Sequence, residues 1–215
     1  MTSLFARLRK RPPAPRMEPA FDAADFARKA EHLAVMTAAF GYDPGKARLV
    51  DEKFSFDLAG VRSKAEGRAL PDGSILVFYD PQMTLARLAC CVAHEAQHQK
   101  YFRVRRAFEA EGEDGPLHET FAAFTPERLA ERRGASDYSN EHWAGWRAAE
   151  PPRLFEDEMA RGGSEPINET LAEVAKALYN FGPDTRIDPL WRALYELILR
   201  EWARLEADEA GVRSG

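Results

Sequence analysis

The sequence predicts an α+β fold, in which a small N-terminal β-sheet packs on one long helix and the C-terminal half is mainly helical. Residues 48–79 contain short runs rich in β-forming residues, separated by Gly60 and by a Pro-Asp-Gly turn signal. An apolar stripe at helical spacing starts at Leu85, and beyond residue 116 the apolar pattern is helical. The chain of 215 residues is long enough to bury a core, so one domain is expected over residues 19–215.

The bulk composition excludes several classes of protein. With 45% hydrophobic and 30% charged residues, the chain has the composition of an ordinary soluble globular protein. A net charge of -5 argues against nucleic-acid binding, which depends on a basic surface. No apolar run is long enough to span a bilayer, so stable membrane insertion is not expected. The sequence leaves the oligomeric state open.

The two cysteines, Cys90 and Cys91, are adjacent in the sequence. Neighbouring residues on a helix point in different directions, so these thiols are poorly placed to form a disulfide with each other. Packing is the expected role of both, and a metal ion held elsewhere would not be bound by thiolates. The absence of a disulfide framework fits a reducing, cytoplasmic setting.

The first segment of the chain is basic. Residues 1–16 carry four arginines and one lysine, no acid, and three prolines. A secretory signal needs an apolar stretch after its basic region, and here prolines follow instead. We expect residues 1–18 to form a disordered basic tail, with a weak membrane-surface contact through Leu4, Phe5 and Leu8 as the alternative.

Helices and strands can be placed in order along the rest of the chain. A first helix is expected over Phe21–Phe40, ended by Gly41, with an inner face of Phe26, Ala30, Leu33, Ala34 and Val35. The most hydrophobic strand, residues 75–79, leads into the long helix, which Thr84 can cap and which is expected to run to Phe108. Further helices are expected at residues 117–133, 141–149, 167–179 and 189–207.

The long helix contains His94, Glu95 and His98 in an HExxH pattern. Residues four apart lie on one helical face, so His94 and His98 can direct imidazole nitrogens at one cation. Glu95, one step round the helix, can reach a water on that cation without being a ligand. The pattern is typical of zinc sites in which the glutamate acts as general base. The alternative is a solvated helix face with two unrelated histidines, which the apolar stripe disfavours because it predicts a helix with one buried side.

Two histidines do not complete a catalytic zinc site, which usually has three protein ligands and one position for water. A third histidine shortly after the motif is missing, since Tyr101 and Val104 stand where the metzincin pattern has its glycine and histidine. The remaining candidates for the third ligand are His118, His142 and a downstream carboxylate.

Among the downstream carboxylates, Glu169 and Glu173 are four residues apart and therefore lie on one helical face. One could bind the metal while the other holds a ligand histidine through its remaining ring nitrogen. The alternative is that both are solvated glutamates on an ordinary helix.

The segment that starts at Asn168-Glu169 resembles the gluzincins, zinc metallopeptidases whose third ligand is a glutamate on a second helix. The thermolysin-like branch has Asn-Glu followed four residues later by an acid, which Glu173 matches. Residues 169–173 are also similar to the Glu-Phe-Phe-Ala-Glu of lethal-factor-like peptidases. The resemblance implies a zincin-like fold, zinc as cofactor, Glu169 as third ligand and a peptide or protein substrate. It covers roughly residues 74–180.

Two further expectations come from this resemblance. The strand at residues 75–79 resembles the strand that runs before the active helix in zincins and often pairs with substrate. Seventy residues separate His98 from Glu169, which is longer than in those families, so the comparison does not place the helices between them.

A donor for the oxyanion is expected from the stretch GASDYSNEHWAGW, which offers Tyr138 and His142. It resembles a Ser-x-Tyr stretch that lethal-factor-like peptidases carry upstream of their glutamate ligand. Tyr138 is the first candidate because a phenol donates at neutral pH, whereas donation by His142 depends on tautomer and charge. The alternative is that Tyr138, Trp143 and Trp146 are helix-packing aromatics.

Together these observations predict a zinc metallopeptidase with Glu95 as general base. The alternative function is a non-catalytic, partner-binding or regulatory protein on a zincin scaffold. Glu95 favours the enzyme because a purely structural zinc site has no use for a base. A fourth protein ligand would favour the alternative, since structural zinc sites are normally closed.

Overall fold

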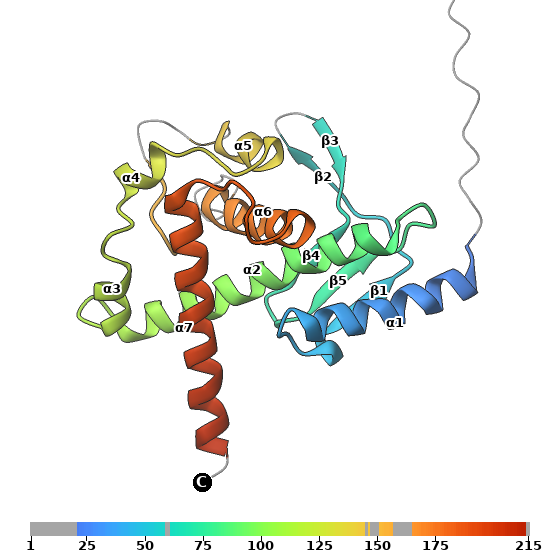
Figure 1. The fold of residues 1–215 in the computed structure, drawn as a ribbon, viewed down its shortest axis with the longest axis horizontal. Helices are drawn as coiled ribbons and strands as arrows, with labels where there is room; N and C mark the ends of the chain where they lie inside the picture. Colours follow the sequence, from blue (N-terminus) through green and yellow to red (C-terminus); the bar gives the residue numbers. More distant parts are fainter. Residues whose placement is uncertain (1–20, 59–60, 145, 147–150, 157–164, 214–215) are drawn as a thin grey trace, which may run out of the picture.

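The long helix α2 (Leu85–Glu111) runs through the middle of the molecule, and α1, the strands β4 and β5, and the helices α6 and α7 all pack against it (Figure 1). The structure is a computed structural model, and it describes residues 21–58, 61–144, 146, 151–156 and 165–213. The predicted basic tail, residues 1–18, lies outside the described residues, and so does the end of the helix predicted at 141–149.

The strands form one small mixed sheet and one hairpin. In the sheet, β5 (Ile75–Phe78) pairs in parallel with β1 (Ala47–Val50) and antiparallel with β4 (Gly67–Ala69). The hairpin consists of β2 (Ser55–Leu58) and β3 (Val61–Lys64). A short 3-10 turn, η1 (Pro44–Lys46), connects α1 to β1. A small sheet packed on α2 confirms the predicted α+β architecture.

The order of the sheet corrects one expectation. The strand before α2 is β5, and it lies between β1 and β4, so both of its edges are already paired. A paired strand has no free N–H and C=O groups for a substrate, so β5 cannot be the pairing edge. The edge strand that packs against α2 is β4.

Helix α1 (Ala23–Ala39) starts at Asp22, whose side chain accepts hydrogen bonds from two backbone N–H groups of the first turn. Leu33 is buried against the sheet and α2, as predicted. Val35 was expected on the same inner face, but its side chain is 64% exposed. Residues two apart on a helix lie about 200° apart, so the two cannot share a face.

Helix α2 begins as the sequence predicts and ends one turn later than expected. The Thr84 side chain accepts a hydrogen bond from Arg87 N at 3.2 Å. The helix continues to Glu111 and stops at Gly112, which adopts a φ of 73° that favours glycine. Its predicted apolar stripe is buried at Leu88, Ala89, Val92 and Ala96.

The helix predicted at 117–133 is in fact two short helices, α3 (Pro116–Phe121) and α4 (Pro126–Ala130). Thr125 caps α4 and Pro126 is its first residue. Proline has no N–H to continue a preceding helix but is favoured at the first position of a new one. The remaining helices are α5 (Asp137–Ala144), α6 (Pro166–Phe181) and α7 (Pro189–Arg213).

Two hydrophobic clusters lie along α2, one at its start and one at its end. The first joins α1 and the sheet to the start of α2 and includes Leu33, Ile75 and Val92. The second joins the end of α2 to α6 and α7 and includes Leu171 and Trp191. The HExxH residues lie where these two clusters meet, so helix packing on both sides fixes their position. Among the described helices, none combines the length and apolar character needed to cross a membrane.

Candidate metal centre

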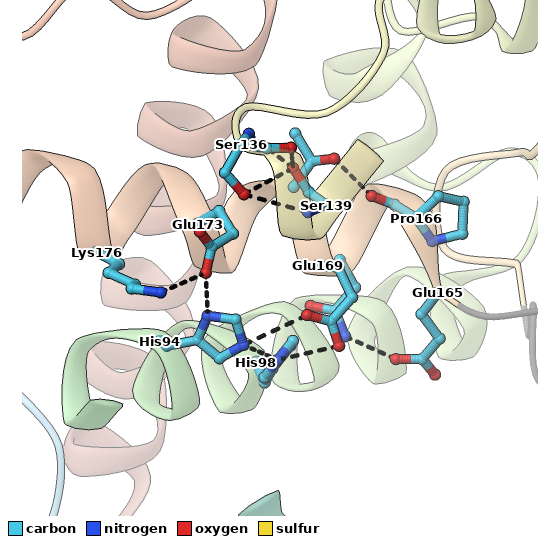
Figure 2. A network of polar contacts seen from close by, with 11 residues as sticks. His94, His98, Ser136, Ser139, Glu165, Pro166, Glu169, Glu173 and Lys176 are labelled. Atoms are coloured by element: carbon cyan, nitrogen blue, oxygen red, sulfur yellow. Dashed lines mark hydrogen bonds and ion pairs between the residues drawn. The ribbon is translucent and has the colours of Figure 1, made fainter. Parts of the chain in front are cut away.

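Three of the predicted ligands converge between α2 and α6 (Figure 2). The Nε2 atoms of His94 and His98 lie 3.0 Å apart. Glu169 Oε2 lies 3.3 Å from His94 Nε2, and Glu169 Oε1 lies 3.6 Å from His98 Nε2. The group could hold a metal ion, with the two histidines buried and Glu169 largely so.

The spacing of these donors fits a tetrahedral zinc ion. With zinc–ligand bonds of about 2.0–2.1 Å, neighbouring ligand atoms of a tetrahedral site lie roughly 3.3 Å apart. The observed separations, 3.0, 3.3 and 3.6 Å, bracket that value. Two imidazoles and a carboxylate are also a common donor set for zinc in proteins. The residues present therefore fit the ion that the sequence predicts.

Helix packing brings Glu169 to the two histidines. Pro166 occupies the first turn of α6, where its missing N–H is no loss, and Glu169 follows in the same turn. One face of α6 packs into the hydrophobic cluster with α2 through Ile167, Leu171 and Val174, which have no exposed surface. This places Glu169 opposite the HExxH turn of α2.

Glu173 lies one helical turn beyond Glu169 and contacts the other side of the His94 ring (Figure 2). Its Oε1 is 3.2 Å from His94 Nδ1, and Lys176 Nζ donates to the same oxygen at 3.0 Å. This is the geometry expected of a carboxylate that orients a ligand histidine.

The electrostatics of the centre favour positive charge. Burial lowers the pKa of His94, but the carboxylates of Glu169 and Glu173 raise it more, to about 10. Burial raises the pKa of both carboxylic acids, while the neighbouring histidines lower it more, to about 2 in each case. Two ionised carboxylates therefore flank the His94 ring.

Glu95 is buried between α2 and the edge strand β4. Its carboxylate accepts a hydrogen bond from the Ala69 N–H, and burial raises its pKa. The close approach depends on Gly67: a Cβ there would lie 2.8 Å from Glu95 Oε1 and 2.7 Å from Cys91 Sγ. Sequence reasoning missed Gly67 and Ala69, although a glycine inside a strand is a signal for close approach of another group.

Helix α5 brings Tyr138 and His142 to the centre. The Tyr138 ring centroid lies 6.1 Å from that of His94 and 4.9 Å from that of His142. Burial raises the pKa of Tyr138, and the carboxylates of Glu169, Glu95 and Glu173 raise it further. His142 is buried, which lowers its pKa. The phenol is therefore neutral and able to donate at any physiological pH.

Trp143 and His118, the other aromatic residues considered for this region, lie in different surroundings. Trp143 packs in the core and donates from Nε1 to Thr170 Oγ1 on α6 at 3.0 Å, so it docks α5 onto the ligand helix. His118, an alternative third ligand, stacks on Phe108 with ring centroids 3.7 Å apart. Phe108 lies ten residues beyond His98, or roughly 15 Å along the helix axis. His118 is therefore not part of the centre, and His142 is not among its three converging donors.

A scan against models of known protein families finds no match, and searches of curated proteins and of solved structures find none either. The chemistry of the centre follows from its own residues. Two imidazoles and one carboxylate can hold a cation, a second carboxylate orients one imidazole, and a third, Glu95, lies beside the donors. Both free thiols, Cys90 and Cys91, lie outside the converging set.

Proposed function

We propose that this protein is a zinc-dependent metallopeptidase. The observation that carries the proposal is the position of Glu95: it is buried next to the three converging donors without being one of them. A carboxylate in that place has no structural task in holding the ion but is suited to proton transfer. A closed structural site would have a fourth donor, and the converging group among the described residues has three.

Each residue of the centre has a role in this proposal. His94, His98 and Glu169 would hold the zinc ion, which would supply Lewis-acid polarisation of the substrate carbonyl and a lowered pKa for the attacking water. Glu95 would accept a proton from the attacking water and later deliver it to the leaving amine. Its pKa, raised by burial, makes the carboxylate a stronger base than an exposed glutamate.

Three further side chains support the reaction. Glu173 fixes the tautomer and orientation of His94 through Nδ1. Tyr138 is the proposed donor to the oxygen on which negative charge develops, and His142 is the second candidate for that role. The proposed substrate is a peptide or protein, and the proposed setting is cytoplasmic.

The metal part of the proposal is tested by elemental analysis of the purified protein. The wild type is expected to contain about one zinc per chain, because three donors surround one point. The variants His94→Ala, His98→Ala and Glu169→Ala should lose it. His118→Ala is the matched control and should retain full zinc content. Zinc retained at full occupancy in Glu169→Ala would overturn the assignment of the third ligand.

The catalytic part is tested by Glu95→Gln in a screen of peptide hydrolysis. The change keeps the size of the side chain but removes its basicity, so turnover should fall by at least ~100-fold while zinc stays bound. Hydrolysis at the wild-type rate by a zinc-loaded Glu95→Gln protein would contradict the mechanism. Zinc-loaded wild type that cleaves no peptide in a diverse library would contradict the function.

A further inference from the structure

Three carboxylates follow one another along the face of α6 that is turned toward α2. Glu165, the N-cap residue of α6, precedes Glu169 and Glu173 at the same helical spacing, and all three side chains extend from α6 toward α2 (Figure 2). Glu173 contacts His94, whereas Glu169 lies between His94 and His98. The two helices therefore run antiparallel here, and Glu165 follows on the His98 side of the metal centre.

The negative charges of these three carboxylates are balanced to different degrees. Glu173 accepts a hydrogen bond from Lys176 at 3.0 Å and also contacts an imidazole. Glu169 contacts both imidazoles and is one of the three converging donors. In the described part of the chain, Glu165 pairs with no lysine, arginine or histidine, and its carboxylate accepts a hydrogen bond from the neutral amide of Asn168 at 3.0 Å. Glu165 is therefore the acid of this row that has no counter-ion.

The position of Glu165 at the start of α6 does not account for its carboxylate. An acidic N-cap side chain normally accepts a hydrogen bond from a backbone N–H group of the first helical turn. Glu165 makes no such bond. Its carboxylate is held instead by Asn168, whose side chain is 1% exposed. A buried amide thus fixes the orientation of a carboxylate that is itself partly exposed and can be reached by a ligand.

The distance from Glu165 to the metal centre matches the spacing of residues in a bound peptide. Residues four apart on a helix are roughly 6 Å apart along its axis, and this is the separation of Glu165 from Glu169. An extended peptide advances about 3.3–3.6 Å per residue, so roughly 6 Å corresponds to two residues. A peptide whose scissile carbonyl lies beside Glu169 therefore brings a group about two residues away to Glu165.

We propose that Glu165 binds a positively charged group of the substrate, within about two residues of the scissile bond. The inference rests on the proposed peptidase function and names a substrate class for it. The group is either a lysine or arginine side chain or the α-ammonium of the substrate's first residue, since both donate charge-assisted hydrogen bonds to a carboxylate. Glu165 selects the peptide and takes no part in proton transfer.

The probes are hexapeptides of alanine in which lysine occupies each position in turn. Norleucine replaces lysine in the matched set, because it keeps most of the side chain and removes the charge, and every peptide is made with a free and with an acetylated N-terminus. The acetylated norleucine peptides are the uncharged references. For the zinc-loaded wild type, one lysine position or the free N-terminus should raise kcat/KM at least ~10-fold over the reference. Whichever change has this effect identifies the source of the charge.

Two variants assign the preference to Glu165. Glu165→Gln keeps the size of the side chain and an oxygen for Asn168, so zinc content should be retained while the ratio of kcat/KM between charged and reference peptides falls toward one. Glu141→Gln is the matched control on α5. Glu141 is exposed, and its charge is close enough to raise the pKa of Tyr138. This variant removes the same charge from the neighbourhood without touching Glu165, so it should keep the wild-type ratio.

A binding measurement separates this inference from the proposed function. Calorimetry with the zinc-loaded Glu95→Gln protein measures the affinity for the same peptides without depending on turnover, and the charged peptide should bind at least ~10-fold more tightly than its reference. That preference, found together with a wild type that cleaves nothing, would refute the peptidase and support the role of Glu165. The inference is overturned if charged and reference peptides bind equally, if Glu165→Gln keeps the preference, or if Glu141→Gln lowers it as much.

Discussion

Buried polar groups on the two sides of α2 differ in whether they have hydrogen-bond partners. On the side that faces α1 and the sheet, they have partners. Lys29 Nζ donates to Asp25 at 2.6 Å and to the Asp80 carbonyl at 2.8 Å. Gln99 binds two carbonyls of the β4–β5 connection, and Thr37 donates to Leu33 O at 2.7 Å. These side chains complete the fold.

On the side of α2 that faces α6, buried polar atoms without partners gather. Within the described residues, His98 Nδ1, Gln97 Nε2 and Asn168 Oδ1 have no hydrogen-bond partner. His94 and His98 direct like nitrogen atoms at each other. Such groups cost stability unless something pairs with them.

The difference shows which buried polar groups serve the fold and which serve a ligand. The same helix satisfies its glutamine on one side and leaves another unsatisfied two residues away. We therefore interpret the imidazole nitrogens of His94 and His98 that converge on Glu169 as groups retained for binding a cation.

Gly67 lies on the sheet side of α2, against Cys91 and Glu95, and its replacement should have the largest effect on stability. In Gly67→Ala the new Cβ would overlap Cys91 Sγ and the Glu95 side chain. Overpacking of this kind typically costs about 1–3 kcal/mol of unfolding free energy. Gly211→Ala on α7 meets nothing within 4 Å and should stabilise the protein by about 0.5–1 kcal/mol, as alanine in a helix does. Urea denaturation measures both the expected loss of stability in Gly67→Ala and the expected gain in Gly211→Ala.

The Gly67→Ala variant also tests whether β4 positions Glu95 for hydrolysis, apart from its effect on stability. Because Glu95 must move aside, hydrolysis by Gly67→Ala should fall further than the loss of folded protein explains. Equal stability of Gly67→Ala and wild type would show that β4 shifts freely, and would remove the argument that this strand positions Glu95.

The candidate centre illustrates what local sequence rules can predict. His94 and His98 follow from helical periodicity alone, and Glu173 follows from the same spacing relative to Glu169. The choice of Glu169 over His118 came from a family resemblance, because seventy intervening residues leave the relative position of two helices undetermined by spacing. Only tertiary packing decides which downstream residue reaches the histidines.

The rest of the fold was less predictable for similar reasons. The order of strands in the sheet depends on pairing partners, which the alternation within β5 does not reveal. Gly67 and Ala69 were missed because their role lies in the backbone of a neighbouring strand. The break between α3 and α4, by contrast, has a local signal in Thr125-Pro126, a capping residue followed by a helix-starting proline.

Glu173→Gln tests the side of α2 that faces α6, where the metal centre lies. The change replaces an ionised acceptor for His94 Nδ1 by a neutral one. Zinc affinity should fall by ~10–100-fold, the usual effect of losing a partner that orients a ligand histidine. A competition assay with a chelator measures it, and Glu196→Gln on α7, an exposed position, is the control. An unchanged dissociation constant would mean that the His94–Glu173 contact is only structural.

Gln99→Leu tests the side of α2 that faces the sheet. The two hydrogen bonds to Leu70 O and Ser74 O would be lost, at about 1 kcal/mol each, or about 2 kcal/mol of unfolding free energy. Both carbonyls retain a backbone donor, which keeps the loss moderate. Gln97→Leu is the matched variant and should be neutral or stabilising, since no hydrogen bond is lost. Equal losses in the two variants would contradict the distinction between the two sides of α2.

Tyr138→Phe should have the smallest effect, and it decides whether α5 belongs to the reaction or only to the packing. The change removes one oxygen, so folding and zinc content should match the wild type. If the phenol donates to the developing oxyanion, kcat should fall by ~10-fold, about 1.4 kcal/mol, with little change in KM. Trp143→Phe is the matched packing variant: it removes the hydrogen bond to Thr170 and should lower stability with a smaller effect on kcat per folded molecule. A wild-type kcat for Tyr138→Phe would reduce Tyr138 to an aromatic neighbour of His94 and leave His142 as the remaining candidate on α5.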